Sequence, residues 1–200
     1  MRFVLASSNQ NKIKELRTIL SNVLSDSEVI TLSEAGITDD IVEDGSTFAE
    51  NALIKARVAA STGNIGIADD SGLTVKALGG EPGIYSARYA GDHGNDKANN
   101  EKLLENMKGV VDRRAAFVCS IACVFPDGRD AIVAEGSVEG EILEAPRGEG
   151  GFGYDPLFWE PTLGKTLAEA SYEEKNAISH RARALALFAQ KFKDILEEKK

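Results

Sequence analysis

Two adjacent carboxylates follow an apolar, strand-like run, where Ile65–Ala68 leads directly into Asp69 and Asp70. Ionised carboxylates are costly to bury without a partner, so this placement calls for a specific role. In an extended backbone consecutive side chains point to opposite sides, so one carboxylate can face a site while the other braces a neighbouring loop. Carboxylate oxygens of this kind are the hard ligands that suit Mg²⁺. The alternative is an Asx-type turn that caps the strand and binds nothing.

A second acidic pair, Glu43 and Asp44, stands shortly before a predicted helix. Thr47 is a good N-cap for that helix, and Glu50 three residues later predicts a capping box. Two acidic pairs near the ends of regular elements strengthen the interpretation as a metal site.

Basic residues stand where two predicted helices begin. Ser7 and Asn9 form a polar turn after the first strand, Asn9 is a plausible N-cap, and Lys12 falls in the first turn of the helix. Free backbone N–H groups and the positive end of the helix dipole suit phosphate there. A cation is disfavoured at that end, so Lys12 hints at an anionic partner. A capped helix with a solvated lysine is the alternative.

The last predicted helix repeats this arrangement. Ser179 fits an N-cap, and His180, Arg181 and Arg183 follow within the first turn. Arginine is favourable against the dipole when it forks onto a phosphate or a base carbonyl. Basic side chains facing solvent are the alternative.

Strand and helix patterns alternate along the chain and predict an α/β fold around a mixed sheet. A Pro126–Gly128 turn between two strand-like segments predicts a hairpin, and the Gly-rich stretch Gly148–Pro156 interrupts regular structure. The expected strands are Arg2–Ala6, Ile65–Ala68, Ala115–Phe125 and Ala131–Ser137. Four helices are expected. The second runs from Thr47 to Gly63 and the third covers about Asp96–Met107. Apolar residues at helical spacing mark the first (Ile13, Leu16, Ile19 or Leu20, and Val23) and the last (Leu185, Phe188, Phe192 and Ile195).

The composition excludes several classes of protein. The chain has 200 residues, of which 42% are hydrophobic and 28% charged, enough for a real core in one domain. Its net charge of −9 disfavours binding to duplex nucleic acid or an anionic membrane surface. No apolar run approaches the length of a membrane span, and the N-terminal apolar stretch is too short for a signal peptide. Cys119 and Cys123 are expected as buried strand thiols in a reducing cytoplasm.

Six segments, in the order expected, together resemble the inosine/xanthosine triphosphate pyrophosphatase family, and the resemblance covers the chain from about residue 2 to 190. Each segment alone is weak evidence, but the ordered set is specific. The segments are Ser7-Ser8-Asn9-x-x-Lys12-x-x-Glu15, Thr47-Phe48-x-Glu50-Asn51-Ala52-x-x-Lys55-Ala56, Ala68-Asp69-Asp70-Ser71-Gly72-Leu73, Leu78-Gly79-Gly80-x-Pro82-Gly83-x-x-Ser86-Ala87-Arg88, Gly150-Gly151-Phe152-Gly153-Tyr154-Asp155-Pro156 and Lys175-x-x-x-Ser179-His180-Arg181.

The resemblance implies roles for individual residues. Glu43 and Asp70 would hold Mg²⁺, and Asp70 would also accept a proton; Asp69 would support that site, and Lys55 would lie beside the phosphates. The implied phosphate-binding turn is Ser7, Ser8, Asn9, Gln10, Asn11 and Lys12. The implied contacts to the rest of the substrate are Ser71, Phe152, which would stack on the purine, Gly153, Tyr154, Asp155, Lys175, His180 and Arg181.

The resemblance also implies a whole-chain expectation for residues 1–200. It is a single domain of two lobes around a long, twisted mixed β-sheet with a central substrate cleft, forming a cytoplasmic homodimer. The implied activity is Mg²⁺-dependent hydrolysis of ITP, dITP and XTP to the nucleoside monophosphate and pyrophosphate. Two alternatives stay open: a related pyrophosphatase of modified pyrimidine nucleotides, and a non-catalytic nucleotide-binding regulator.

Overall fold

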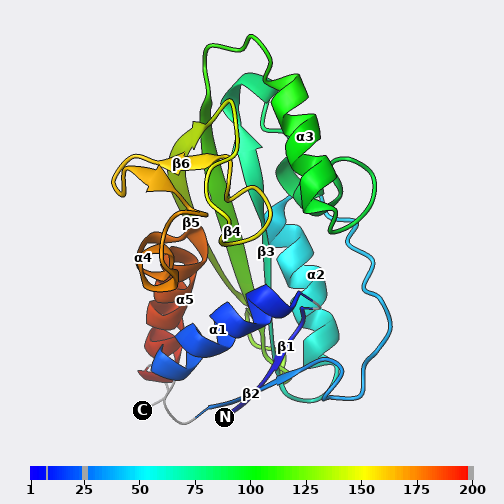
Figure 1. Cartoon of the computed structure of the whole chain (residues 1–200). Helices are drawn as coiled ribbons and strands as arrows, with labels where there is room; N and C mark the ends of the chain where they lie inside the picture. Colours follow the sequence, from blue (N-terminus) through cyan, green and yellow to red (C-terminus); the bar gives the residue numbers. More distant parts are fainter. Residues whose placement is uncertain (8, 24–26, 198–200) are drawn as a thin grey trace. The chain divides into compact units, whose positions relative to one another are not determined.

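The computed structural model describes residues 1–7, 9–23 and 27–197, and within them seven strands form one sheet in the order β2-β1-β3-β4-β5-β6-β7 (Figure 1). The strands are β1 (Arg2–Leu5), β2 (Glu28–Thr31), β3 (Ile65–Val75), β4 (Arg114–Val124), β5 (Ile132–Ile142), β6 (Phe158–Glu160) and β7 (Lys165–Thr166). The α-helices are α1 (Gln10–Val23), α2 (Phe48–Ala60), α3 (Asp96–Asn106), α4 (Tyr172–Ile178) and α5 (His180–Glu197), and the 3₁₀ turns are η1 (Lys76–Leu78) and η2 (Gly83–Arg88).

The sheet is mixed, which confirms the predicted α/β class. Strand β1 pairs in parallel with β2 and β3, whereas β6 pairs antiparallel with β5 and β7. Strands β4 and β5 are neighbours joined by the short connection that the turn at Pro126–Gly128 predicted. The Gly-rich stretch Gly148–Pro156 contains no helix or strand, as expected.

Strand β3 is much longer than the predicted Ile65–Ala68, and this corrects the interpretation of the two carboxylates. The strand continues past Asp70 because Leu73 and Val75 resume the buried alternation on its far half. The backbone N–H of Leu73 donates to Ser86 Oγ at 2.9 Å. Asp69 and Asp70 therefore lie in the interior of a strand, and the Asx-turn alternative is wrong. The predicted strand Ala131–Ser137 likewise extends to Ile142.

The chain divides into two compact units. Unit 1 comprises Met1–Asp70, Cys119–Gly136 and Arg181–Lys200, and unit 2 comprises Ser71–Val118 and Ser137–His180.

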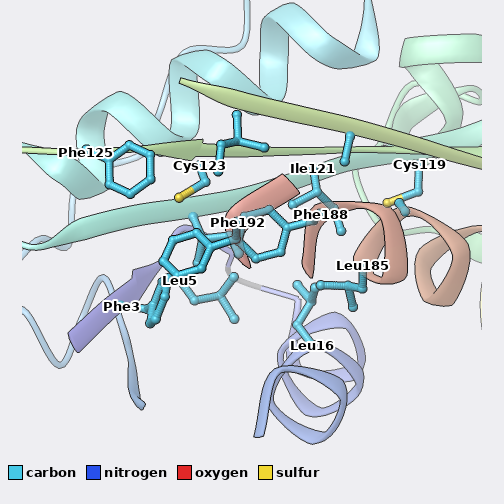
Figure 2. Close-up of a cluster of buried hydrophobic side chains, with 14 of the residues drawn as sticks. Phe3, Leu5, Leu16, Cys119, Ile121, Cys123, Phe125, Leu185, Phe188 and Phe192 are labelled. Atoms are coloured by element: carbon cyan, nitrogen blue, oxygen red, sulfur yellow. The ribbon is translucent and has the colours of Figure 1, made fainter. Parts of the chain in front are cut away.

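Unit 1 has a core in which β1, α1, β4 and α5 contribute large apolar side chains (Figure 2). Phe192 of α5 packs against Phe3, with ring centroids 5.6 Å apart, and stacks on Phe125 at 5.8 Å. Leu16 of α1 and Leu185 of α5 are fully buried in the same cluster. For α5, the apolar spacing that predicted the helix marks the face that it buries. For α1 this holds for Ile13 and Leu16, whereas the side chains of Ile19, Leu20 and Val23 lie outside what the structure describes.

Within unit 1, helix α2 packs closely on β3 because the contact is made of small residues. Three alanines of α2 are fully buried and contact Ala68 of β3 in one cluster: Ala52, Ala56 and Ala59. A side chain on Gly66 would approach the backbone N of Ala60 to 2.5 Å and collide with the Ala56 carbonyl. Gly66 thus sets the distance between the helix that carries Lys55 and the strand that carries Asp70.

Gly66→Ala is expected to destabilise the protein by about 1–3 kcal/mol, because the added methyl group overpacks a contact made of backbone atoms that cannot move aside. Chemical denaturation followed by circular dichroism would measure this loss. An unchanged midpoint would contradict the close approach of α2 and β3.

Unit 2 has its own core, formed by side chains from the far half of β3, α3, β4, β5 and the segment before β6. Its largest buried members include Leu73, Leu103, Met107 and Phe158, and Phe117 packs on Phe158 with centroids 4.7 Å apart. This core fixes the backbone around the Gly-rich stretch.

Cys119 and Cys123 are free, buried thiols, as predicted. Burial raises the pKa of each thiol to about 12, so both are protonated and unreactive at neutral pH. None of the helices in the described ranges is both long and apolar enough to cross a membrane.

Candidate active site

Asp69 is the carboxylate that braces neighbouring elements of unit 1. Its Oδ2 lies 3.3 Å from Lys12 Nζ of α1, 3.3 Å from Arg181 Nε and 3.4 Å from Arg181 Nη2 of α5. Burial favours the neutral acid, but the charges of Lys12, Arg181 and Lys55 outweigh it and hold the pKa of Asp69 well below its usual value. Asp69 is therefore a buried, ionised anchor between two helix N-termini.

Asp70 points to the opposite side of β3 and joins a different group. Lys55 Nζ of α2 lies 2.9 Å from Asp70 Oδ1 and 2.9 Å from Glu43 Oε2, so one ammonium bridges two carboxylates. Burial raises the pKa of Asp70 above its usual value despite the nearby lysines. The pKa of Lys55 is raised: burial lowers it, but the surrounding carboxylates more than compensate. A carboxyl whose pKa is raised inside a charged cluster is a good candidate for a general base.

The segment that carries Glu43 is tied to the N-terminus of α2. Thr47 Oγ1 accepts the backbone N–H of Glu50 at 3.1 Å, as the predicted capping box requires. The reciprocal bond differs from the prediction, because Glu50 Oε2 accepts from both the N–H and the hydroxyl of Ser46 instead of from Thr47. The capping therefore reaches one residue further back and fixes the chain close to Glu43.

Asn51 connects this segment to the carboxylate on β3. Its Oδ1 accepts the Gly45 N–H at 2.9 Å, and its Nδ2 donates to Asp70 Oδ2 at 3.4 Å. The side chain is buried and lies four residues before Lys55, on the same face of α2. The sequence analysis assigned Asn51 no role, although an asparagine four residues before a lysine on an otherwise alanine-rich face was a usable signal.

The carboxylates fit a divalent cation that is shared with a substrate. Among the described residues, no three His, Cys, Asp or Glu side chains gather closely enough to enclose a metal by themselves. Glu43 and Asp70 instead supply two carboxylates around one position that a cation, here Lys55, already neutralises. Mg²⁺ characteristically takes one or two carboxylates and completes its shell with water and phosphate oxygens.

Chelation is expected to leave the fold intact, because Lys55 already compensates both carboxylates. The melting temperature in excess EDTA should match that in Mg²⁺ to within about 1 °C when no nucleotide is present. A fall of many degrees in EDTA would mean that a bound metal, and not Lys55, holds Glu43 and Asp70 together.

The predicted phosphate-binding turn begins α1. Asn9 caps the helix as predicted: its Oδ1 accepts the Lys12 N–H at 3.2 Å, and its own N–H donates to Ser7 Oγ at 3.3 Å. Gln10 is exposed at the first helical position. Ser8 and the side chain of Asn11 lie outside what the structure describes.

In unit 2, the predicted base-binding residues form a second cluster. Asp155 and Lys175 are buried, and Lys175 Nζ lies 2.6 Å from Asp155 Oδ2. The same oxygen accepts the Phe152 N–H at 2.9 Å, and Lys175 Nζ lies 4.4 Å from the centroid of the Phe152 ring. One ion pair thus fixes both the backbone and the ring of Phe152.

Three other predicted residues lie in unit 2. Tyr154 is buried, and its hydroxyl donates to the Ser86 carbonyl at 2.8 Å. His180 is buried and stacks on Phe117, with ring centroids 5.0 Å apart. Ser71 is half-buried on β3. Ser179, expected as an N-cap, directly precedes α5 but is also the last residue of the turn that ends α4, a helix that the sequence analysis did not predict.

The model of the Ham1 family matches residues 3–191 of this chain. The chain belongs to the Ham1 family. This confirms the family resemblance drawn from the six segments. A dITP/XTP pyrophosphatase of Clostridium perfringens is 52% identical over 98% of this chain and 99% of that protein. One of Corynebacterium diphtheriae is 55% identical over 92% of this chain and 93% of that protein.

The solved structures agree with these relatives. The structure of the Staphylococcus aureus Ham1 protein matches this chain with a TM-score of 0.88 and 47% identity, covering 100% of both chains. The described elements therefore form the fold of a Ham1 protein.

Proposed function

We propose that this Ham1-family chain, residues 1–200, is a catalytic domain that hydrolyses dITP, ITP and XTP to the nucleoside monophosphate and pyrophosphate. The observation that carries the proposal is the bridging of Glu43 and Asp70 by Lys55, an arrangement suited to metal-assisted phosphoryl chemistry. The dITP/XTP pyrophosphatases of C. perfringens and C. diphtheriae, about half identical to it over nearly its whole length, support the choice of substrate.

The proposed contacts to the phosphates come from α1, α2 and the two carboxylates Glu43 and Asp70. The N–H groups at the start of α1 and the ammonium groups of Lys12 and Lys55 would compensate the charge of the triphosphate. Glu43 and Asp70 would hold Mg²⁺, which when bound neutralises phosphate charge and lowers the pKa of a coordinated water. Asp70 would accept the proton of the attacking water as the bond between the α- and β-phosphates breaks and pyrophosphate leaves with the bridging oxygen.

The proposed contacts to the base rest on the family resemblance. Phe152 would stack on the purine, and Lys175, His180 and Arg181 would donate to its oxo edge. Adenine carries an amino group, itself a donor, where hypoxanthine and xanthine carry the 6-oxygen. The buried donors of the protein would then stay unpaired, which lowers kcat/KM for ATP relative to ITP. This arrangement would favour hypoxanthine and xanthine over adenine.

The remaining expectations rest on the family resemblance. Mg²⁺ is proposed as the metal, a homodimer as the assembly and the cytoplasm as the location, in keeping with two buried free thiols. Sedimentation velocity would test the dimer, and a single boundary at the monomer mass would contradict it.

Product analysis tests the proposed function. The protein would be incubated with Mg²⁺ and ITP, XTP, GTP, ATP or TTP in separate reactions, and the products separated by chromatography. Strong turnover of ITP and XTP to monophosphate and pyrophosphate is expected. Turnover of TTP would favour a pyrimidine pyrophosphatase. Nucleotide binding without turnover would favour a regulator. Release of orthophosphate would show that the cleaved bond is not the one between the α- and β-phosphates.

A further inference from the structure

Helix α3 holds both polar backbone groups of Gly153, the residue that follows the Phe152 ring. Asp96 Oδ2, at the first position of α3, accepts the Gly153 N–H at 2.7 Å. Asn100 Nδ2, one turn later on the same face, donates to the Gly153 carbonyl at 2.9 Å. All of these residues belong to unit 2. None of the motifs that pointed to the substrate site includes α3.

The two bonds hold the backbone in a single orientation. An acceptor meets the N–H and a donor meets the C=O, so a rotation of either flanking peptide would lose a bond and oppose like groups. Gly153 has a φ of 62°, a conformation that few other residues adopt readily. The bond from Asp96 is charge-assisted and therefore one of the stronger kinds.

The two hydrogen bonds from α3 hold the backbone that follows Phe152, whereas Asp155 holds the backbone that precedes it. Asp155 Oδ2 fixes the Phe152 N–H at 2.9 Å, and α3 fixes the next residue at both its polar groups. The backbone on each side of the Phe152 side chain is thus set by a hydrogen bond from a different element. This is the arrangement expected where the direction of an aromatic ring matters for binding.

We infer that Asp96 and Asn100 are positioning residues that set the orientation of the Phe152 ring and with it the affinity for the purine base. The inference rests on the proposed function, in which Phe152 stacks on the base. Neither residue contacts the Glu43, Lys55 and Asp70 cluster in any described interaction, so their effect falls on KM and not on the chemical step.

The test compares Asp96→Ala and Asn100→Leu with Asp96→Asn, which keeps an acceptor for the Gly153 N–H. Lys97→Ala is the matched control, since the Lys97 side chain is 88% exposed on the same helix. The first two variants should raise KM for ITP about tenfold, the size expected for losing one such bond, while kcat stays within about twofold. Asp96→Asn and Lys97→Ala should keep a KM near that of the wild type.

Inhibition by pyrophosphate separates positioning from general damage, because pyrophosphate has no base. Its inhibition constant should be the same in all four variants. An unchanged KM for ITP in Asp96→Ala and Asn100→Leu would overturn the inference, as would an equal weakening of pyrophosphate inhibition. Failure of the wild-type protein to hydrolyse ITP or XTP would instead overturn the proposed function.

Discussion

Asp70→Asn is expected to lower kcat for ITP and XTP about a thousandfold while the protein remains folded. Asparagine has nearly the shape of aspartate but cannot accept the proton of the attacking water, and general base catalysis typically contributes rate factors of this size. The raised pKa of Asp70 and its contact with Lys55 are the features that mark it for this role. Steady-state kinetics with detection of pyrophosphate would measure the loss.

Asp44→Asn is the matched control for this prediction, because Asp44 is an exposed carboxylate beside Glu43 and makes no described contact with Lys55. Its kcat should stay within about twofold of the wild type. A well-folded Asp70→Asn protein with near-normal kcat would remove Asp70 from the role of proton acceptor. Circular dichroism and thermal melting of both variants would establish that the fold is intact.

Arg181→Met is expected to destabilise the protein by about 3–5 kcal/mol, because it leaves the fully buried Asp69 carboxylate without its guanidinium partner. The Arg181 side chain is itself 1% exposed and lies against Asp69 through Nε and Nη2. Urea denaturation would measure the loss. Adding Asp69→Asn to Arg181→Met should recover part of it, since this removes the buried charge that Lys12 alone would then compensate.

Lys193→Met is the control for Arg181→Met, since Lys193 is an exposed cation on the same helix and should change stability by no more than about 0.5 kcal/mol.

The effect of Arg181→Met should also depend on pH. The folded-state pKa of Asp69 is below its unfolded value, so the stability that Asp69 contributes is present above about pH 4 and lost as the pH falls. The difference between wild type and Arg181→Met should therefore shrink in acid, and a constant difference would contradict the ion pair as its source.

Local patterns predicted the elements that carry the site, but not their full extent. The spacing of Leu185, Phe188 and Phe192 gave α5, and the caps at Asn9 and Thr47 gave the starts of α1 and α2. Strand β3 was predicted too short because two carboxylates resemble the polar end of a strand. Ionised carboxylates are stable in the interior of a strand here because distant parts of the chain supply cations that pair with Asp69 and Asp70.

Contacts between distant parts of the chain could not be predicted from spacing. Asp69 and Arg181 are 112 residues apart, and no local rule joins them. The short strands β6 and β7, with three and two residues, carry too little periodicity to be recognised. Asp96 and Asn100 do show a local signal, two polar residues four apart on a helix, but its partner Gly153 lies in an irregular segment.

The discontinuous make-up of unit 1 has a consequence for its biosynthesis. Its three segments end with Arg181–Lys200, and α5 from this segment supplies Phe188 and Phe192 to the core. A ribosome makes the chain at about 5–20 residues per second, N-terminus first. The apolar side chains of Phe3 and Leu16 therefore stay uncovered by α5 until about nine-tenths of this sequence has been translated. Unit 1 must complete its core late in synthesis, and a nascent chain stalled before Arg181 would expose apolar surface to chaperones.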